Sequence, residues 1–298
     1  MALIALKIDV DTFRGTREGA VRLAGLLERL GVRATFLFSL GPDHTGRAIR
    51  RAFRRGFLGK VKRTSVLEHY GLKTLMYGVL LPGPRIGRRA ADAMRDIGQR
   101  GFEAGVHTWD HVRWQDGVAR ANEAWTRREL TLARDEFAEV FGRMPQVHGA
   151  AGWQMNAYVP ALEQQLGFRY ASDTRGRAPF LPRLAAGTGI PQLPTTLPTL
   201  DELIGRPDLD GEDPIAHLLR LTGGSRATDQ VFTLHAELEG GVYLADFERL
   251  LREWLARGFE LTDLAGYVTR LHLKTLPAAA IDTGEVPGRS GTLAVQGA

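Results

Sequence analysis

The sequence predicts an α/β protein, a distorted (β/α)7-type barrel with a long insertion after the second strand. Apolar strand-like runs and helical patterns alternate seven or eight times along the 298 residues, as in parallel α/β folds. Carboxylates and histidines stand at the ends of several strands, among them Asp9, His107 and His235. The carboxyl ends of strands in a parallel barrel open onto one face, where active sites form. No glycine-rich nucleotide fingerprint follows the first strand, which weakens the alternative of an open Rossmann-type sheet.

The predicted strands and helices are well delimited along the chain. Strands are predicted over residues 3–9, 33–39, 102–106, 145–149, 169–173, 190–194, 231–235 and 258–262. Helices are predicted over residues 17–30, 86–100, 122–141, 156–166, 213–222, 245–257 and 263–273. Gly31, Gly101 and Gly258 follow helical patterns, as expected for residues just past a helix C-terminus. Asp246 and Asp263 are candidate N-caps.

Two segments depart from the alternation and define the expected domain organisation. Residues 42–85 form a basic amphipathic insertion, and residues 277–298 are small, polar and rich in glycine. We therefore expect one barrel over residues 1–276, followed by a mobile C-terminal tail that adds no core.

The composition excludes several kinds of protein and site. With 44% hydrophobic and 24% charged residues, the chain has the composition of an ordinary globular protein. The absence of cysteine excludes disulfides and thiolate metal ligands, which leaves histidine and carboxylate. No apolar run is long enough to span a bilayer. Because the first residues enter a strand directly, we expect no secretory signal and take the cytoplasm as the default compartment.

Two pairs of polar residues at strand ends favour a metal site. Asp9 and Asp11 are two apart on a strand, so both side chains point to the same face. Adjacent carboxylates repel unless a cation lies between them or one is protonated. His107 and His111 are four apart, a spacing that lets both reach one ion from a single helical turn. Each pair alone is equally typical of turn-capping aspartates or surface histidines, but their joint occurrence favours the metal.

The three side chains of Asp11, His107 and His111 form a two-histidine, one-carboxylate ligand set. Such a set suits one divalent ion, Zn²⁺, Co²⁺, Mn²⁺ or Fe²⁺. Asp9 would then act as a general base, and His235 would donate a proton to a departing nitrogen. The alternative for His235 is a buried histidine that bonds to backbone. This arrangement predicts a metal-dependent amide hydrolase.

The order of these motifs resembles the polysaccharide deacetylases of the chitooligosaccharide-deacetylase type. The resemblance rests on Asp-x-Asp near the N-terminus, His-Thr-x-x-His, and Leu234-His235. It implies a distorted (β/α)7 barrel and metal-dependent amide cleavage with Zn, Co or Mn. The family form has adjacent aspartates, which Val10 separates here, and an arginine that steadies the base. Residues 149–156 contain no such arginine, for which Arg14 or Arg175 could substitute.

Further motifs resemble a narrower group, the deformylases that act on 4-deoxy-4-formamido-L-arabinose-phosphoundecaprenol. They lie at residues 8–19, 39–43, 107–111, 150–153, 172–176, 197–202 and 233–237. The resemblance implies release of formate by water, which gives the 4-amino-4-deoxy-L-arabinose lipid carrier used in lipid A modification and polymyxin resistance. It also implies a peripheral enzyme on the cytoplasmic face of the bacterial inner membrane, with the undecaprenyl-phosphate-linked sugar as substrate and no nucleic acid partner. Arg14, Trp153, Asp173 and Arg175 are the candidate substrate-binding residues.

The insertion predicts contact with an anionic membrane surface. Residues 44–67 carry eight Lys or Arg and no Asp or Glu. Basic amphipathic helices of this kind lie in a membrane interface, and each cation near an anionic leaflet contributes about 1 kcal/mol. The candidate contacts are Arg50, Arg51, Phe53, Arg54, Arg55 and Phe57. The alternative is an ordinary solvated helix pair packed on the barrel.

Three other functions compete with the deformylase. An N-deacetylase of a glycan polymer would share the metal site. A non-haem Fe(II) oxygenase would use the same ligand types, although such enzymes sit mostly on β-sandwich folds. A non-enzymatic lipid- or nucleic-acid-binding module would explain the arginines but would leave Asp9, Asp11 and His235 without a role.

Overall fold

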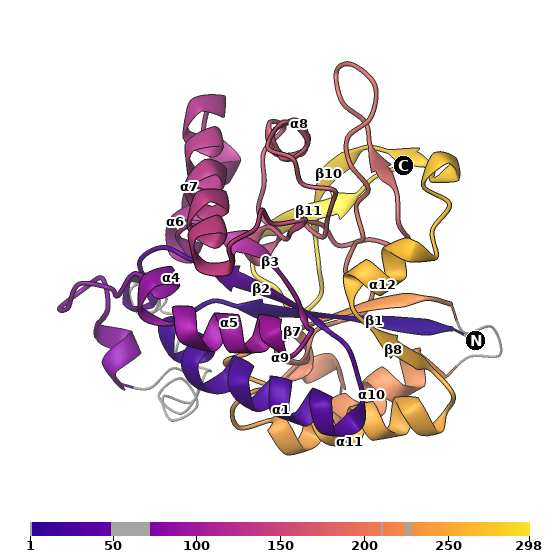
Figure 1. Ribbon diagram of the computed structural model, residues 1–298. Coiled ribbons are helices and arrows are strands. Elements are labelled where there is room, and N and C mark those ends of the chain that lie inside the picture. The colour runs from indigo at the N-terminus through magenta and orange to yellow at the C-terminus, as the bar shows by residue number, and fades with distance from the viewer. Residues whose placement is uncertain (1, 49–71, 210, 224–227) are drawn as a thin grey trace.

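A curled sheet of parallel strands forms the centre of the molecule (Figure 1). The computed structural model describes residues 2–48, 72–209, 211–223 and 228–298. The strand order is β5-β4-β3-β2-β1-β7, and β8 pairs with β1. The bounds are β1 Leu3–Val10, β2 Thr35–Ser39, β3 Glu103–Thr108, β4 Val147–His148, β5 Tyr170–Ala171, β7 Gln230–His235 and β8 Glu260–Thr262. The predicted α/β fold of the barrel type is confirmed.

Strand β1 is the central strand, and all eight of its residues are buried. A strand covered on both faces has a nearly continuous apolar sequence, as Leu3–Ile8 has apart from Lys7. In the register of the sheet, Asp9 lies opposite Leu37 of β2 and His235 of β7. This register brings the polar residues at the carboxyl ends of the strands together on one face.

The segment predicted as a strand over residues 190–194 closes the sheet without forming a regular strand. Its Leu193 N–H donates to Ala171 O of β5 at 2.8 Å, and Thr196 N–H donates to Val231 O of β7 at 3.1 Å. Pro191 and Pro194 lack an N–H, so the segment cannot make a continuous ladder. The gap between β5 and β7 is therefore spanned by isolated hydrogen bonds and not by a regular strand.

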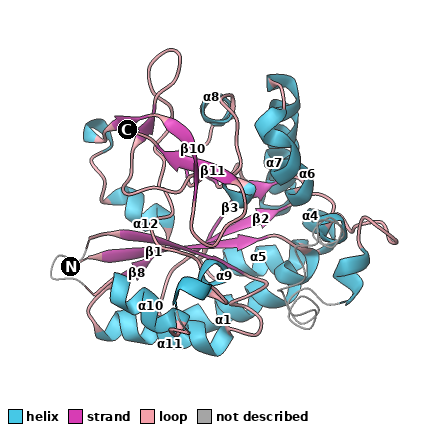
Figure 2. Ribbon diagram, turned by 180° about the vertical axis from the view of Figure 1, so that it is seen from behind, coloured by secondary structure: helices cyan, strands magenta, loops and turns pink. Residues whose placement is uncertain are grey.

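Helices cover the outside of the sheet, and α1, α10 and α11 lie together along one side of it (Figure 2). Their bounds are α1 Ala20–Leu30, α4 Ile86–Arg89, α5 Ala91–Gln99, α6 His111–Gly117, α7 Glu123–Phe141, α8 Val159–Gln165, α9 Leu200–Leu203, α10 Pro214–Leu221, α11 Leu244–Ala256 and α12 Leu264–Thr269. Short helical turns are η1 Gly15–Gly19, η3 Val118–Arg120, η4 Ala151–Trp153, η5 Pro207–Leu209 and η6 Leu273–Thr275. Gly31 ends α1 in the left-handed conformation and Asp263 caps α12, as predicted. Asp246, expected as a cap, lies instead in the first turn of α11.

The expectation that residues 277–298 add no core is wrong. Strands β10 (Ile281–Glu285) and β11 (Thr292–Gln296) form an antiparallel pair, and β9 (Ala278–Ala279) pairs with β6 (Leu181–Pro182). Leu293 and Ala294 are 5% and 4% exposed. The backbone of β11 also bonds to Arg175, whose N–H donates to Ala294 O at 2.9 Å. The sequence of this segment has few large apolar side chains to indicate a strand. Its strands are instead held by backbone pairing.

Only part of the insertion lies within the described residues. The candidate membrane contacts between Arg50 and Phe57 fall outside them, so that prediction stays a prediction. Residues 72–76 are helical, and the side chains of Leu72 and Leu80 are 69% and 75% exposed. Within the described part of the chain, no helix is both long and apolar enough to cross a membrane.

Candidate active site

The structure brings Asp11, His107 and His111 together at the carboxyl ends of β1 and β3. His107 Nε2 lies 3.2 Å from Asp11 Oδ1, and His111 Nε2 lies 3.4 Å from Asp11 Oδ2. One ligand atom from each side chain lies within 4.8 Å of the others, close enough to share one ion. The predicted convergence of these distant segments is therefore present in the fold.

The two histidines do not come from one helical turn, contrary to the reasoning from their spacing. His107 lies in β3, whereas His111 is the first residue of α6. Asp110, between them, caps α6 by accepting a hydrogen bond from Arg113 N–H at 3.0 Å. Its other oxygen lies 2.6 Å from His44 Nδ1. This cap fixes the sharp turn from strand to helix that lets both rings face Asp11.

The loop that carries Asp11 is held by Glu237, which follows β7. Glu237 Oε1 accepts hydrogen bonds from Asp11 N–H at 3.1 Å, Thr12 N–H at 2.9 Å and Thr12 Oγ1 at 2.8 Å. Because three donors converge on one oxygen, the backbone after β1 has little freedom. The side chain of Asp11 is thereby aimed at the histidines.

The hydrogen bonds and charges around the three candidate ligands fit a divalent cation. His107 Nδ1 donates to Gly149 O at 2.7 Å, which leaves Nε2 as the acceptor that faces Asp11. Asp11 Oδ1 is buried and has no hydrogen-bond partner. Burial would raise the pKa of Asp11, yet the two histidines hold that pKa well below its usual range. Burial lowers the pKa of His111, which favours the neutral imidazole that a metal ion binds.

Asp9 lies on the same face of β1 beside a buried lysine. Lys7 is fully buried, and its Nζ lies 3.3 Å from Asp9 Oδ2 and donates to Ser172 O at 3.0 Å. The other oxygen of Asp9 has no hydrogen-bond partner and lies 3.8 Å from His107 Nδ1. Lys7 thus pairs with one carboxylate oxygen of Asp9, and the other oxygen can accept a further hydrogen bond. The sequence signal for this role of Lys7 is a single lysine within the otherwise apolar run Leu3–Ile8.

His235, at the end of β7, faces an acidic residue that the sequence reasoning missed. Its Nδ1 lies 3.6 Å from Asp201 Oδ1 of α9. Burial would lower the pKa of His235, but the carboxylates of Asp201 and Asp11 raise it. Asp201 is in turn paired with Arg289, whose Nη2 lies 3.0 Å from Asp201 Oδ2. A chain of alternating charges therefore runs from the C-terminal segment to the imidazole.

Trp153 packs edge-to-face against His235, with ring centroids 6.4 Å apart, and has only 2% of its surface exposed. The cations of Lys7, Arg175 and Arg289 lie over its ring, at 5.3, 5.1 and 4.7 Å from the centroid. Its φ of 51° is rare for a residue with a side chain. The indole N–H donates to Thr195 Oγ1 at 3.1 Å. The ring of Trp153, a candidate substrate-binding residue, therefore contacts cations of the protein itself.

Two other candidate substrate-binding residues are engaged within the protein. Arg175 is 8% exposed, with Nη1 at 2.5 Å from Glu202 Oε1 and Nη2 donating to Leu197 O at 3.0 Å. Asp173 is fully buried and accepts from Ala150 N–H at 2.7 Å. These contacts do not support the expected role of either side chain in substrate binding.

Arg14 is the substrate-binding candidate that lies at the surface of the site. It donates from Nε to Glu18 Oε2 at 3.1 Å and lines a surface cavity beyond the metal ligands. Of the four predicted residues, Arg14 lines this open cavity, whereas Trp153, Asp173 and Arg175 are buried.

A second histidine and carboxylate cluster lies in the core. His148 Nδ1 is 2.6 Å from Glu163 Oε1 and 3.0 Å from Asp173 Oδ1, and all three residues are fully buried. Burial opposes the charge on His148, but the two carboxylates raise its pKa to about 10. These are ordinary hydrogen-bond distances, so the cluster is an internal ion pair that joins β4 to α8 and to the segment after β5.

Comparison with known sequences identifies the family. The sequence model described as polysaccharide deacetylase matches residues 3–171. The chain belongs to the polysaccharide deacetylase family. A protein of Shewanella sediminis, named "Probable 4-deoxy-4-formamido-L-arabinose-phosphoundecaprenol deformylase ArnD", is 34% identical over 98% of this chain and 94% of its own length. A protein of the same name from Wigglesworthia glossinidia brevipalpis is 30% identical over 95% of this chain and 98% of its own length.

Solved structures confirm the family fold. The crystal structure of a "putative polysaccharide deacetylase" from Mycobacterium smegmatis matches with a TM-score of 0.66 and 19% identity, over 96% of this chain and 95% of that one. The family's metal-dependent chemistry agrees with the ligand set described above, and the two named relatives support a deformylase or deacetylase. The resemblance noted from the motifs is thus confirmed.

Proposed function

We propose that this protein removes formate from 4-deoxy-4-formamido-L-arabinose-phosphoundecaprenol by metal-dependent hydrolysis. The observation that carries amide hydrolysis is the grouping of Asp11, His107 and His111 beside a carboxylate, Asp9, and an imidazole, His235. The substrate is inferred from the names of the two relatives, which align over nearly the whole chain. The product is the 4-amino-4-deoxy-L-arabinose lipid carrier used in lipid A modification and polymyxin resistance.

Asp9 is the proposed general base. Lys7 holds one of its oxygens, and the other lacks a hydrogen-bond partner, so it is free to take a proton from the attacking water. An ion of Zn, Co or Mn held by Asp11, His107 and His111 would polarise the amide carbonyl and acidify a water molecule. The water oxygen bonds to the formyl carbon while Asp9 accepts the proton.

His235 is the proposed general acid. Amines are poor leaving groups, so the C–N bond breaks when the nitrogen receives a proton. The negative charges of Asp201 and Asp11 raise the pKa of His235 and favour the imidazolium that donates it. One water and one formamide are consumed, and one amine and one formate are released.

The localisation follows from this substrate. We place the enzyme as a peripheral protein on the cytoplasmic face of the bacterial inner membrane, where a polyprenyl-linked sugar is accessible. The exposed side chains of Leu72 and Leu80 support a membrane contact. The role of the basic residues between Arg50 and Phe57 stays a prediction, because they lie outside the described residues.

The test is formate release from the lipid-linked formamido sugar, with the acetamido analogue and a chitin oligosaccharide as competing substrates. Asp9→Asn should retain metal by elemental analysis and lose about 10²–10⁴-fold in turnover. A chelator should abolish activity, and one equivalent of Zn, Co or Mn should restore it. Preferential release of acetate would replace the deformylase with a glycan N-deacetylase, and full activity of Asp9→Asn would remove Asp9 as the base.

A further inference from the structure

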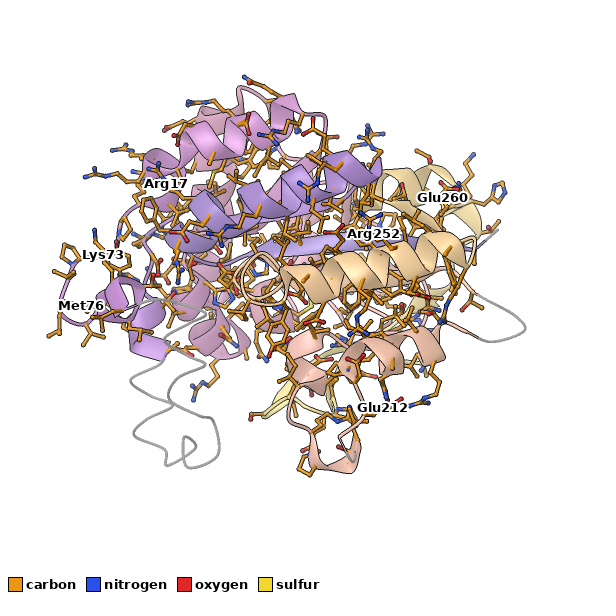
Figure 3. The ribbon with its side chains drawn as sticks, turned by 90° about the horizontal axis from the view of Figure 1, so that it is seen from below. Arg17, Lys73, Met76, Glu212, Arg252 and Glu260 are labelled. Carbon is orange, nitrogen blue, oxygen red and sulfur yellow. The ribbon has the colours of Figure 1, made fainter. Side chains whose placement is uncertain are left out.

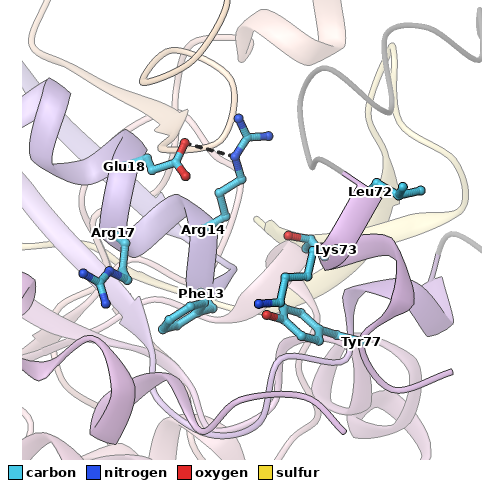
Figure 4. Close-up of a pocket in the computed structure, with 8 residues that line it drawn as sticks. Phe13, Arg14, Arg17, Glu18, Leu72, Lys73 and Tyr77 are labelled. Carbon is cyan, nitrogen blue, oxygen red and sulfur yellow. Dashed lines mark hydrogen bonds and ion pairs between the residues drawn. The ribbon is translucent and has the colours of Figure 1, made fainter. Parts of the chain in front are cut away.

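A cavity of about 640 Å³ opens where the chain leaves β1 beyond the candidate active site. Phe13, Arg14 and Arg17 form one wall, and Lys73 and Tyr77 form the facing wall. Figure 4 shows the two walls across the opening, with Phe13 and Arg17 opposite Lys73 and Tyr77. The proposed chemistry leaves this cavity without a role.

The cavity is adjacent to the metal ligands through the chain itself. Phe13 is two residues after Asp11, so their Cα atoms lie within about 7 Å of each other. Phe13 N–H donates to Asp43 Oδ2 at 2.9 Å, which fixes the start of this wall. A molecule bound here can therefore present one end to the candidate active site.

The lining combines positive charge with aromatic surface. Three cations, Arg14, Arg17 and Lys73, line the cavity with one carboxylate, Glu18. Glu18 already pairs with Arg14 at 3.1 Å and with Arg22 at 3.8 Å. The guanidinium of Arg17 lies 5.9 Å from the ring centroid of Phe13, so charge and apolar surface are presented side by side. This chemistry suits an anion that carries an apolar group.

An exposed apolar edge continues outward from the cavity. Leu72 and Leu80 are 69% and 75% exposed, and Val79 and Leu81 are each 36% exposed. Figure 3 shows Arg17, Lys73 and Met76 along the same edge of the molecule. Single exposed apolar residues are ordinary, but four on one ten-residue segment next to cations are typical of a lipid-facing surface.

We propose that this cavity binds the phosphodiester and the first isoprene units of a polyprenyl-phosphate-linked sugar, while residues 72–81 contact the bilayer. The substrate rests on the proposed function, whereas the location of its phosphate rests on the cavity. Arg17 and Lys73 bind the phosphate, and Phe13 and Tyr77 pack against the first apolar units. The sugar is thereby directed toward Asp11.

The kinetic test compares two substrates that share the formamido sugar. One is the undecaprenyl-phosphate-linked sugar, and the other is a soluble methyl glycoside without phosphate. The variant Arg17→Ala/Lys73→Ala should raise KM for the lipid substrate by about tenfold or more relative to its effect on the glycoside. Arg252→Ala is the matched control, because Arg252 is an exposed cation of α11 that pairs with Glu248 away from this edge. Equal effects on both substrates, or none on either, would overturn the proposal.

A binding measurement separates this proposal from the proposed reaction. The purified protein is floated with phosphatidylcholine vesicles that contain either undecaprenyl phosphate or undecaprenol. Wild type should prefer the phosphate-bearing vesicles in the presence of 10-fold excess inorganic phosphate, and Arg17→Ala/Lys73→Ala should lose that preference. A preference that the variant retains, or that inorganic phosphate abolishes, contradicts a lipid phosphate in this cavity. If wild type cleaves neither substrate but shows this preference, the proposed deformylation is refuted while the proposed phosphate-binding site is supported.

Discussion

Replacing Lys7 with methionine tests whether the buried lysine holds the candidate base. The side chain of Lys7 is fully buried, 3.3 Å from Asp9 Oδ2 and 3.0 Å from Ser172 O. Methionine preserves most of the volume and removes the charge, which leaves Asp9 as a buried carboxylate without its cation. Breaking a buried pair in this way costs about 3–5 kcal/mol. We expect the free energy of unfolding to fall by that amount.

Activity should fall with stability, because an uncompensated buried carboxylate favours its protonated form, which cannot act as a base. The assays are urea denaturation of metal-loaded protein and formate release. Lys7→Met in an Asp9→Asn background is the control, since the charge that needs Lys7 is then absent. Coupling between the two sites of about 1–3 kcal/mol is expected. A loss below about 1 kcal/mol, or the same loss in both backgrounds, would refute the pairing.

Three other predictions follow from the geometry. Arg289→Gln should leave metal content unchanged and lower turnover about tenfold, because Asp201 loses the cation, 3.0 Å away, that positions its carboxylate beside His235; unchanged turnover at saturating substrate would contradict this positioning role. His111→Ala should strip the metal in elemental analysis, and full metal occupancy in that variant would exclude it as a ligand. The pKa of His148 is about 10 when folded and near 6.5 when unfolded, so its stabilising contribution is complete below about pH 6.5 and is lost as the pH rises toward 10. Urea denaturation between pH 7 and 9.5 should show a decline in wild type of up to about 1.4 kcal/mol per pH unit from this group, and a shallower slope in His148→Gln/Asp173→Asn. Identical slopes would remove His148 as the titrating group.

Most of the fold could be predicted from the sequence because its strands and helices are strongly periodic and well capped. The apolar run of β1 and the glycine that ends α1 are local signals that the fold preserves. The segment at 190–194 resisted prediction, since its two prolines allow isolated bridges and prevent a regular strand. Residues 292–296 were not predicted as a strand, because they pair with residues 281–285 and with the distant backbone of Arg175, contacts that leave no local sequence signal.

Some residues of the candidate site could likewise be predicted from local sequence, and others could not. The grouping of Asp9, Asp11 and His107 could be predicted because strand ends in a parallel barrel share one face, and His111 follows the end of β3 by three residues. Asp201 and Arg289 could not, because their contact joins residues far apart in the chain and has no local pattern. The structure does not support the expected contacts of Asp173 and Arg175 with substrate, because both side chains are buried, which their sequence context does not reveal.

The late position of Arg289 separates the assembly of the site into two stages. All three proposed metal ligands belong to the first 111 residues, whereas the guanidinium that pairs with Asp201 comes from the last ten. A nascent or truncated chain that stops before Arg289 contains all three proposed metal ligands. It lacks the guanidinium that pairs with Asp201, the carboxylate beside the proposed general acid His235. Proteolysis near the C-terminus would therefore yield a protein that still takes up metal but turns over slowly.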